Sequence, residues 1–291
     1  MKRDVALDLL RITCCLMVIG IHVTPDYSLT VASNLPMHIQ IQSLLTQSIV
    51  RIGLPVFFML SGYYLLNKAD ENLKVFYKKR LSSILIPFLA YSLIHFYVMN
   101  YVDATNQGIG VYLTKIFTSS TNLSVYFWFV YAMVGLYIIS PAIKYITNKI
   151  PKEDSVKVII VICIIFYYSL YSFSASQSFS SYHHLIPVQG IDTWVLYFVI
   201  GGLLKRVDVN KRHLLIALPT VILVNVVTVY FSTNRFNFNI SPYDSGFNML
   251  LACSVFVLAF SKIKINNESL FCVFIERVAP LTYGIYLNSR A

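Results

Sequence analysis

The first apolar run of the chain carries three ionisable side chains, Asp8, Arg11 and His22. Such side chains are costly inside a membrane-spanning segment, so each of them is a candidate functional residue. Arg11 and His22 are 11 residues apart. In a helix this spacing places them within ~20° of one face and roughly 16 Å apart along the axis. We therefore expect one helix face to present a guanidinium and an imidazole at two different depths.

These two side chains have complementary chemistry. An imidazole changes its protonation near neutral pH, which suits it to remove a proton from an attacking hydroxyl group. A guanidinium binds phosphate and stabilises a developing oxyanion in a low-dielectric site. Asp8, three residues before Arg11, is expected to pair with it and to lower the cost of burying the cation. The alternative without chemistry is that Arg11 extends to lipid headgroups and His22 lies in the opposite interface.

A second apolar run, residues 41–66, adds Arg51, Pro55, Ser61 and Gly62. Pro55 removes a backbone donor and is expected to kink the helix. The small pair Ser61 and Gly62 allows another helix or a ligand to approach closely. Packing of a neighbouring helix, without any chemistry, is the alternative role for this pair.

A basic cluster, Lys78-Lys79-Arg80, lies just before the third apolar run. It is suited to bind the phosphates of a nucleotide-type donor through charge-assisted hydrogen bonds. The same cluster would also anchor a membrane span to anionic lipid. The sequence leaves both roles open.

The cysteines do not form a metal motif. They are odd in number, lie in or beside apolar runs and lack the spacing of a zinc site. We expect them to be small buried hydrophobic residues, and we expect no metal site. The five are Cys14, Cys15, Cys163, Cys253 and Cys272.

Transmembrane helices must position these side chains, because the composition excludes an ordinary soluble domain. Of the 291 residues, 57% are hydrophobic and 12% are charged, against about 25% charged in a typical soluble domain. The mean hydropathy is +0.65. Continuous apolar runs of about 20 residues predict helices, whereas a β-barrel would show alternation. The predicted fold class is all-α, a polytopic transmembrane helical bundle.

We predict about eight or nine spans, the last of them incomplete. No internal repeat or soluble insert interrupts them, so the chain is predicted to form a single domain. The predicted ranges are 5–24, 41–66, 81–102, 126–147, 158–175, 191–204, 214–231 and 244–264, with a final apolar piece at 269–288.

The basic residues predict the orientation of these helices, because positive charges are retained on the cytoplasmic side. With strictly alternating loops, 17 lysines and arginines fall on the side of the N-terminus, and only Lys115 and Arg235 fall on the other. We therefore expect a multi-pass protein of the cell membrane with a cytoplasmic N-terminus. The net charge of +10 is then a signal of topology in a lipid bilayer, and no nucleic acid partner is expected.

Six motifs occur in one order along the chain. They are Asp8-Leu-Leu-Arg11 with His22, Arg51-Ile-Gly-Leu-Pro55-Val-Phe57-Phe58 with Ser61-Gly62-Tyr63, Lys79-Arg80 with Pro87, Tyr126-Phe-Trp128-Phe with Pro141, Tyr197-Phe198 with Gly201, and Thr282-Tyr-Gly284-Ile-Tyr286-Leu287. Over nearly the whole chain this order resembles the membrane-bound acyltransferase 3 family, whose members O-acylate surface polysaccharides and related glycans.

The resemblance implies an O-acyltransferase in which His22 is the catalytic base or acyl relay and Arg11 binds or orients the donor. The implied donor is cytoplasmic acyl coenzyme A, most often acetyl-CoA, used as a co-substrate with no bound cofactor. The implied acceptor is a hydroxyl group of a surface polysaccharide or lipid-linked glycan on the outer side. The implied donor- or pore-binding residues are Asp8, Arg51, Ser61, Gly62, Lys79 and Arg80, with the last two at the cytoplasmic mouth.

The chain differs from that family at its C-terminal end. Family members continue the stretch Tyr283 to Leu287 with Ile-His and a further apolar run, and the position of that histidine is occupied here by Ser289. The last helix is expected to be too short to cross ~30 Å of hydrocarbon. We therefore expect a single membrane acyltransferase domain over residues 1–291 that is truncated at its C-terminal end.

Two other functions fit parts of the sequence. A polytopic transporter or exporter of a small or glycan-related solute also has helices broken by glycine and proline around buried charges. A non-catalytic membrane sensing module is the third interpretation, although a soluble enzyme domain is not found in this sequence. Acyl transfer is the principal prediction.

Overall fold

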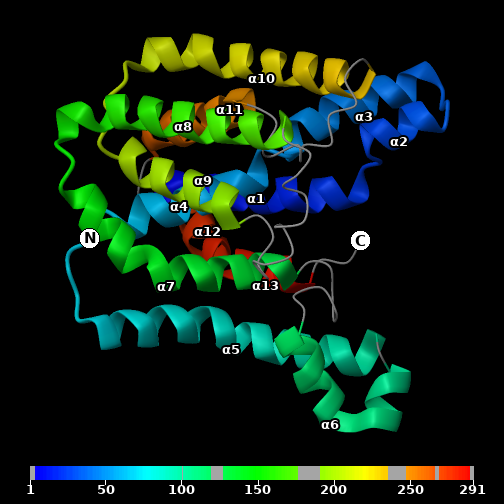
Figure 1. Ribbon diagram of the computed structural model, residues 1–291. Coiled ribbons are helices and arrows are strands. Elements are labelled where there is room, and N and C mark those ends of the chain that lie inside the picture. Colours follow the sequence, from blue (N-terminus) through cyan, green and yellow to red (C-terminus); the bar gives the residue numbers. More distant parts are fainter. Residues whose placement is uncertain are drawn as a thin grey trace.

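The computed structural model describes residues 4–99, 101–118, 127–175, 191–234, 247–265 and 269–288. This part of the chain is a bundle of helices without a strand, which confirms the predicted fold class. Most of the long helices run side by side (Figure 1). In chain order the elements are α1 (Val5–Val23), α2 (Tyr27–Ala32), α3 (Met37–Val50), α4 (Gly53–Leu65), α5 (Leu73–Met99), α6 (Tyr101–Thr118), α7 (Trp128–Asn148), η2 (Lys152–Asp154), α8 (Ser155–Ala175), α9 (Ile191–Leu204), α10 (Lys211–Asn234), α11 (Phe247–Ser261), α12 (Leu270–Val278), η4 (Ala279–Leu281) and α13 (Thr282–Asn288).

Several segments are suited to cross a bilayer by their length and composition. Within the described residues, five long apolar segments meet this condition: Val5–Ala32, Met37–Leu65, Leu73–Val98, Trp128–Asn148 and Lys211–Phe231. Shorter apolar helices are Gly108–Phe117, Thr193–Leu204 and Asn248–Ser261. The chain is therefore a multi-pass helical membrane protein, while the number of eight or nine spans stays a prediction.

The segment 41–66, predicted as one helix, consists of the two helices α3 and α4. They meet at a turn formed by Arg51 and Ile52. Pro55 explains the position of this break. It has no N–H to donate to the carbonyl of Arg51, and its ring would clash with that carbonyl in a regular helix.

Two helices, α2 and α6, lie where no helix was predicted. The short helix α2 begins at Asp26, whose carboxylate accepts a hydrogen bond from the Ser28 N–H at 2.9 Å. Helix α6 is interrupted at Gly108, which has φ 66° and ψ −164°, a conformation that glycine adopts without strain. The apolar part of α6 is only Gly108–Phe117, which is too short to give the hydropathy signal of a span.

Helix α4 forms the centre of the bundle and packs against α1, α7, α9 and α11. Its closest approach is to α9. A Cβ added to Gly62 would lie 1.8 Å from the carbonyl oxygen of Phe198, and one added to Gly201 would lie 2.1 Å from that of Met59. Small residues allow backbones to pack this closely in membranes. The α4–α9 pair is thus a rigid support for α1, which carries Arg11 and His22.

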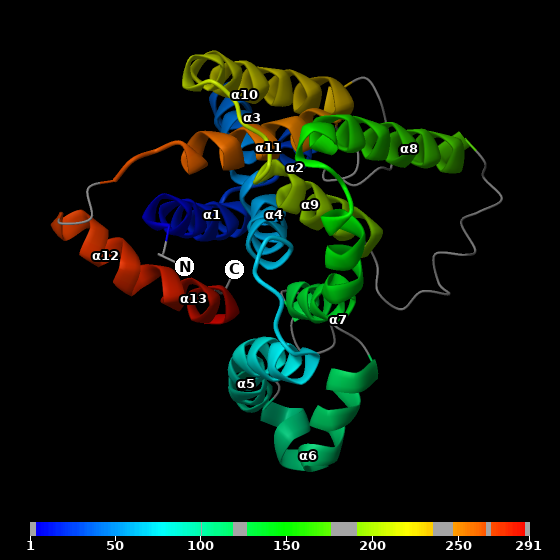
Figure 2. The same cartoon turned by 90° about the vertical axis from the view of Figure 1, so that its left-hand side faces the viewer.

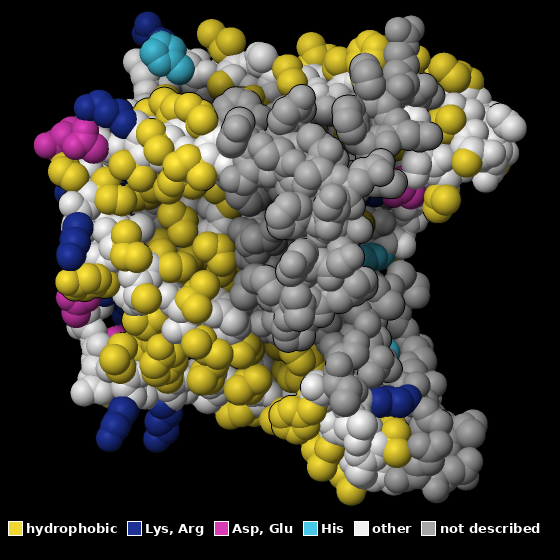
Figure 3. Space-filling view, viewed as in Figure 1, with side chains coloured by type: hydrophobic (Ala, Val, Ile, Leu, Met, Phe, Trp, Pro, Cys, Tyr) yellow, Lys and Arg dark blue, Asp and Glu magenta, His cyan; other side chains and the backbone are white. Residues whose placement is uncertain are grey.

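The loops that were predicted to share the cytoplasmic side meet at one end of the bundle. Arg206 donates to the carbonyl of Thr147 at 2.8 Å and to that of Ile150 at 3.2 Å, and it also reaches the side chain of Asn67 at 3.3 Å. Figure 3 shows that lysines and arginines gather along this edge, beside a broad apolar surface. Two further ion pairs at this end of the bundle are Lys144–Asp70, from α7 to the α4–α5 loop, and Lys262–Asp208.

The C-terminal piece 269–288 is divided into α12 and α13 by the short turn η4, which contains Pro280. Helix α13 packs against α1 and α5. The hydroxyl of Tyr283 donates to the carbonyl of Ile84 at 2.8 Å and so ties this segment to α5. Residues Tyr126, Arg235 and Ser289 lie outside the described part of the chain, as does the predicted truncation.

Candidate active site

A cavity of about 1010 Å³ lies between α1, α4, α5, α7 and the C-terminal segment η4–α13. In the view of Figure 2, α1 and α4 lie at the top of this group of elements, α13 and α7 on either side of it and α5 at the bottom. Most of the cavity wall is apolar. A large apolar cavity with a few polar groups is typical of a small-molecule site. The polar side chains in its wall include Arg11, Ser61, Ser83, Tyr91, Tyr137 and Tyr283.

Arg11 lies in the wall of this cavity and is held by its own helix. Its Nη1 donates to Asp8 Oδ1 at 3.2 Å, and the two side chains are 34% and 4% exposed. The guanidinium also lies 5.8 Å from the centre of the Tyr64 ring, within range of a cation–π interaction. Asp8 is therefore a buried counter-ion behind Arg11, as predicted from the spacing of three residues.

Helix α5 contributes one face to the cavity. Ser83, Ile84, Pro87 and Tyr91 all line it, and Arg80 precedes Ser83 and Ile84 by one helical turn on the same face. Arg80 is not itself part of the described wall and lies one helical turn beside it, at the basic end of α5. Its Nε is buried and has no hydrogen-bond partner among the described residues, so a donor is available there for an anion.

Tyr137 on α7 is a site residue that the sequence analysis missed. It lines the cavity, and both Arg11 and Arg80 lie within electrostatic reach of its hydroxyl. Pro141 lacks the N–H that would bond to the Tyr137 carbonyl in a regular helix, and the Ser140 hydroxyl donates to that carbonyl instead at 3.0 Å. Pro141, in the motif that begins at Tyr126, was therefore a signal that this turn of α7 is unusual.

His22 lies in the last turn of α1, one helical turn beyond Ile19. Ile19 lines the cavity, whereas His22 is half-buried and is not part of its described wall. The structure thus places Arg11 in the cavity and His22 just past it on the same helix. Three residues of helix separate Ile19 from His22, or about 4.5 Å along the axis.

Arg51 lies in a different network from Arg11. It forms an ion pair with Asp26, and its Nε donates to Gln47 Oε1 at 3.0 Å. The buried Gln47 side chain donates in turn to Thr24 Oγ1 at 2.8 Å. This network fastens α3 to the C-terminal end of α1, two residues after His22. Arg51 does not belong to the described cavity wall.

The adjacent residues Ser61 and Gly62 face different surroundings. Ser61 lines the cavity, and its hydroxyl donates to the Phe57 carbonyl at 3.0 Å. Gly62 faces α9, where its missing side chain makes room for the backbone of Phe198. The structure therefore places Ser61 in the same cavity wall as Arg11, whereas Gly62 serves helix packing.

Lys79 lies on the exposed side of the basic cluster. Its side chain is 62% exposed, and its Nζ is 3.8 Å from Glu71 Oε2. Glu71 accepts a shorter bond, 2.8 Å, from Lys68. The hydrogen bond from Lys68, together with the charges of Lys68, Lys79 and Arg80, holds the pKa of Glu71 below its ordinary value. Lys79 is thus near Arg80 and outside the central cavity.

The comparison with known families decides the class of this protein. The model of the acyltransferase 3 family, described as an acyltransferase domain, matches residues 4–288. The chain belongs to the acyltransferase 3 family. No curated protein and no solved structure matches the chain. As a member of this family, the protein is a membrane acyltransferase, and the transporter interpretation is not supported.

The cavity of this acyltransferase provides guanidinium groups and hydroxyl groups for an anionic donor. Arg11 supplies positive charge in the wall, Arg80 supplies it one helical turn from the wall residues Ser83 and Ile84, and the Tyr137 hydroxyl lies within electrostatic reach of both. The remaining wall up to Ile19, one turn from His22, is largely apolar. Within the described residues, no group of three or more His, Cys, Asp or Glu side chains is arranged to hold a metal ion.

Proposed function

We propose that this acyltransferase transfers an acyl group, in the simplest case acetyl, from acyl coenzyme A at the basic end to a hydroxyl group of a surface glycan at the other end. One observation carries the proposal. The central cavity has Arg11 in its wall and approaches to within one helical turn of His22 on α1.

The donor fits this arrangement by charge and length. Its phosphates match Arg11 and Arg80, since a guanidinium forms paired, charge-assisted hydrogen bonds to phosphate. Arg11 and His22 lie roughly 16 Å apart along α1, a distance of the order of the extended pantetheine arm. The thioester would then lie near His22 while the phosphates stay at the basic end. The apolar wall residues Phe57, Pro87, Phe129 and Met133 suit the arm between them.

The chemical step follows from this placement. The His22 imidazole accepts the proton of the acceptor hydroxyl as the hydroxyl oxygen attacks the thioester carbonyl. A carbon–oxygen bond forms, the carbon–sulfur bond breaks, and the coenzyme A thiolate leaves with the proton returned by the imidazolium. In the relay variant, the imidazole nitrogen takes the acyl group first and the hydroxyl attacks afterwards.

The two substrates would reach the site from opposite sides of the membrane. The basic loops meet at one end of the bundle. This supports a cytoplasmic position for that end, because lysine and arginine are retained on the cytoplasmic side of a membrane. The acceptor, a surface polysaccharide or a lipid-linked glycan, would then approach the end that carries His22 and the Arg51 network. The protein would act in the cell membrane with its N-terminus in the cytoplasm.

The experiment is acylation by the His22→Ala variant. Mass spectrometry of surface polysaccharide is expected to show a mass increment of one acyl group with the wild type and none with the variant, while membrane insertion is unchanged. His38→Ala is the matched control, because His38 is exposed near the same end of the bundle and should retain acylation. Normal acylation by the His22 variant would remove His22 from the mechanism.

A further inference from the structure

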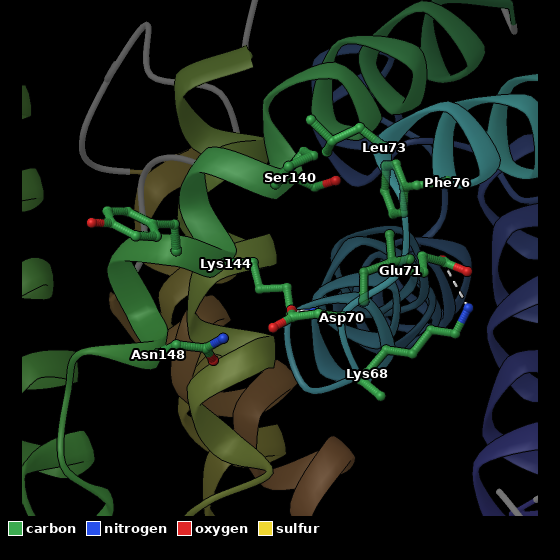
Figure 4. A pocket seen from close by; sticks show the side chains of 12 residues that line it. Lys68, Asp70, Glu71, Leu73, Phe76, Ser140, Lys144 and Asn148 are labelled. Carbon is green, nitrogen blue, oxygen red and sulfur yellow. Dashed lines mark hydrogen bonds and ion pairs between the residues drawn. The ribbon is translucent and has the colours of Figure 1, made fainter.

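A second pocket, of about 300 Å³, lies at the basic end of the bundle between the α4–α5 loop and α7. Figure 4 shows that charged side chains from both elements face one another across it. Its apolar wall is formed in part by Leu73, Phe76 and Tyr145. The pocket thus has an apolar surface on which a flat group can pack, and several charged side chains beside that surface.

Two carboxylates of the α4–α5 loop pair with Lys68 and Lys144, the lysines that line this pocket, and one of them also approaches Lys79, which lies outside the lining. Glu71 accepts a hydrogen bond from Lys68 at 2.8 Å and lies 3.8 Å from Lys79. Asp70 pairs with Lys144, whose side chain is 17% exposed whereas that of Asp70 is 90% exposed. Each of these lysines therefore has a carboxylate partner in the short α4–α5 loop, Asp70 in solvent and Glu71 partly shielded from it.

These contacts can be exchanged for a stronger anion. Each pair has a side chain that reaches solvent, Asp70 at 90% and Lys68 at 36% exposed, and water weakens such pairs by screening. A phosphate group carries up to two negative charges and presents three acceptor oxygens, so it forms stronger charge-assisted hydrogen bonds to the same cations. Arg80 lies next to Lys79 and one helical turn beside the wall of the central cavity, which connects the lysines with the proposed path of the donor.

We propose that this pocket binds the phosphorylated nucleotide part of the donor and that Glu71 and Asp70 compete with its phosphates for Lys68, Lys79 and Lys144. The proposal rests on the acyl coenzyme A donor proposed above. The lysines hold the 3′-phosphate of the nucleotide, the diphosphate stays with Arg11 and Arg80 as proposed above, and the base packs on the apolar wall. Displacement of the two carboxylates accompanies binding.

The test is direct binding of coenzyme A and of adenosine 3′,5′-bisphosphate to the purified full chain, measured by calorimetry at fixed ionic strength. Glu71→Gln and Asp70→Asn are each expected to tighten binding about threefold, the scale of one weak surface ion pair. Lys144→Met is expected to weaken it about tenfold, since a charge-assisted bond is lost.

Asp154→Asn is the matched control. It removes the same charge at the same end of the bundle, but Asp154 pairs with Lys157 and does not line the pocket. Unchanged binding by this variant, with tighter binding by Glu71→Gln, supports competition inside the pocket. Equal tightening by Asp154→Asn would show a general charge effect and overturn the proposal.

Other outcomes separate this proposal from the function itself. If coenzyme A binds and Arg11 variants weaken it, but Glu71, Asp70 and Lys144 variants do not change it, the pocket is not the nucleotide site and the proposed function stands. If neither probe binds the wild type, the donor proposal fails as well. Vesicles of anionic lipid that compete fully with the nucleotide would assign the pocket to lipid phosphate and overturn the proposal.

Discussion

Arg11 and Arg51 are two arginines in apolar segments, yet their surroundings differ in kind. Arg11 lies in the wall of the central cavity, 34% exposed, and its partner Asp8 is on the same helix. Arg51 is 16% exposed and is bound across two helices, to Asp26 and to Gln47. One cation faces a space that a ligand can enter, and the other connects elements of the bundle.

The difference shows that a charge within a membrane span has more than one use. Burial of a guanidinium requires a partner in either case. A partner on the same helix, as Asp8 is for Arg11, leaves the cavity side of the guanidinium available for a substrate. A partner across an interface uses the charge for positioning, and here it orders the end of α1 that carries His22. The neighbours Ser61 and Gly62 divide in the same way: Ser61 lines the cavity, whereas Gly62 allows α4 to pack on α9.

The largest effect is expected from Arg11→Gln. This variant removes the Arg11 ion pair of the buried Asp8 carboxylate, which costs about 3 kcal/mol of folding stability, and it removes a phosphate ligand from the cavity. The double variant Asp8→Asn with Arg11→Gln should recover the melting temperature in detergent but not acylation. Recovery of acylation by the double variant would mean that Arg11, like Arg51, has a positioning role.

A smaller effect is expected from Gly62→Ala, because the new methyl group would lie 1.8 Å from the Phe198 carbonyl oxygen. Separation of α4 from α9 should cost about 1–3 kcal/mol and lower the melting temperature. The neighbouring variant Ser61→Ala should keep the melting temperature and change only the KM for the acyl donor. Equal melting temperatures for the two variants would contradict the division between packing and cavity on α4.

The smallest effect is expected from Arg51→Lys. A lysine can still pair with Asp26 but cannot reproduce the bond to Gln47, so about 1 kcal/mol of stability should be lost. Because this network orders the end of α1 beside His22, kcat should fall severalfold while the affinity for coenzyme A stays unchanged. The control is Arg212→Lys on an exposed surface of α10. A changed affinity with an unchanged kcat would place Arg51 with Arg11 on the donor side.

Much of the fold could be predicted from the sequence. Continuous apolar runs predict helices because the bilayer sets their length and leaves no other partner for the backbone. Pro55 predicted a kink, and the structure has a turn one helical turn before it. Helix α6 escaped prediction because Gly108 interrupts it and only a short apolar part remains.

The sequence by itself determined the helical membrane class and the pairing of Asp8 with Arg11, because hydropathy and the period of a helix are local properties of the chain. Only the tertiary structure decided that Ser61 and Tyr137 share a cavity with Arg11, that Arg51 turns to Asp26, and that Gly62 packs on Phe198. These contacts join residues far apart in the chain. The physical reason is that the packing of whole helices decides which face of each helix meets another helix, a cavity or lipid.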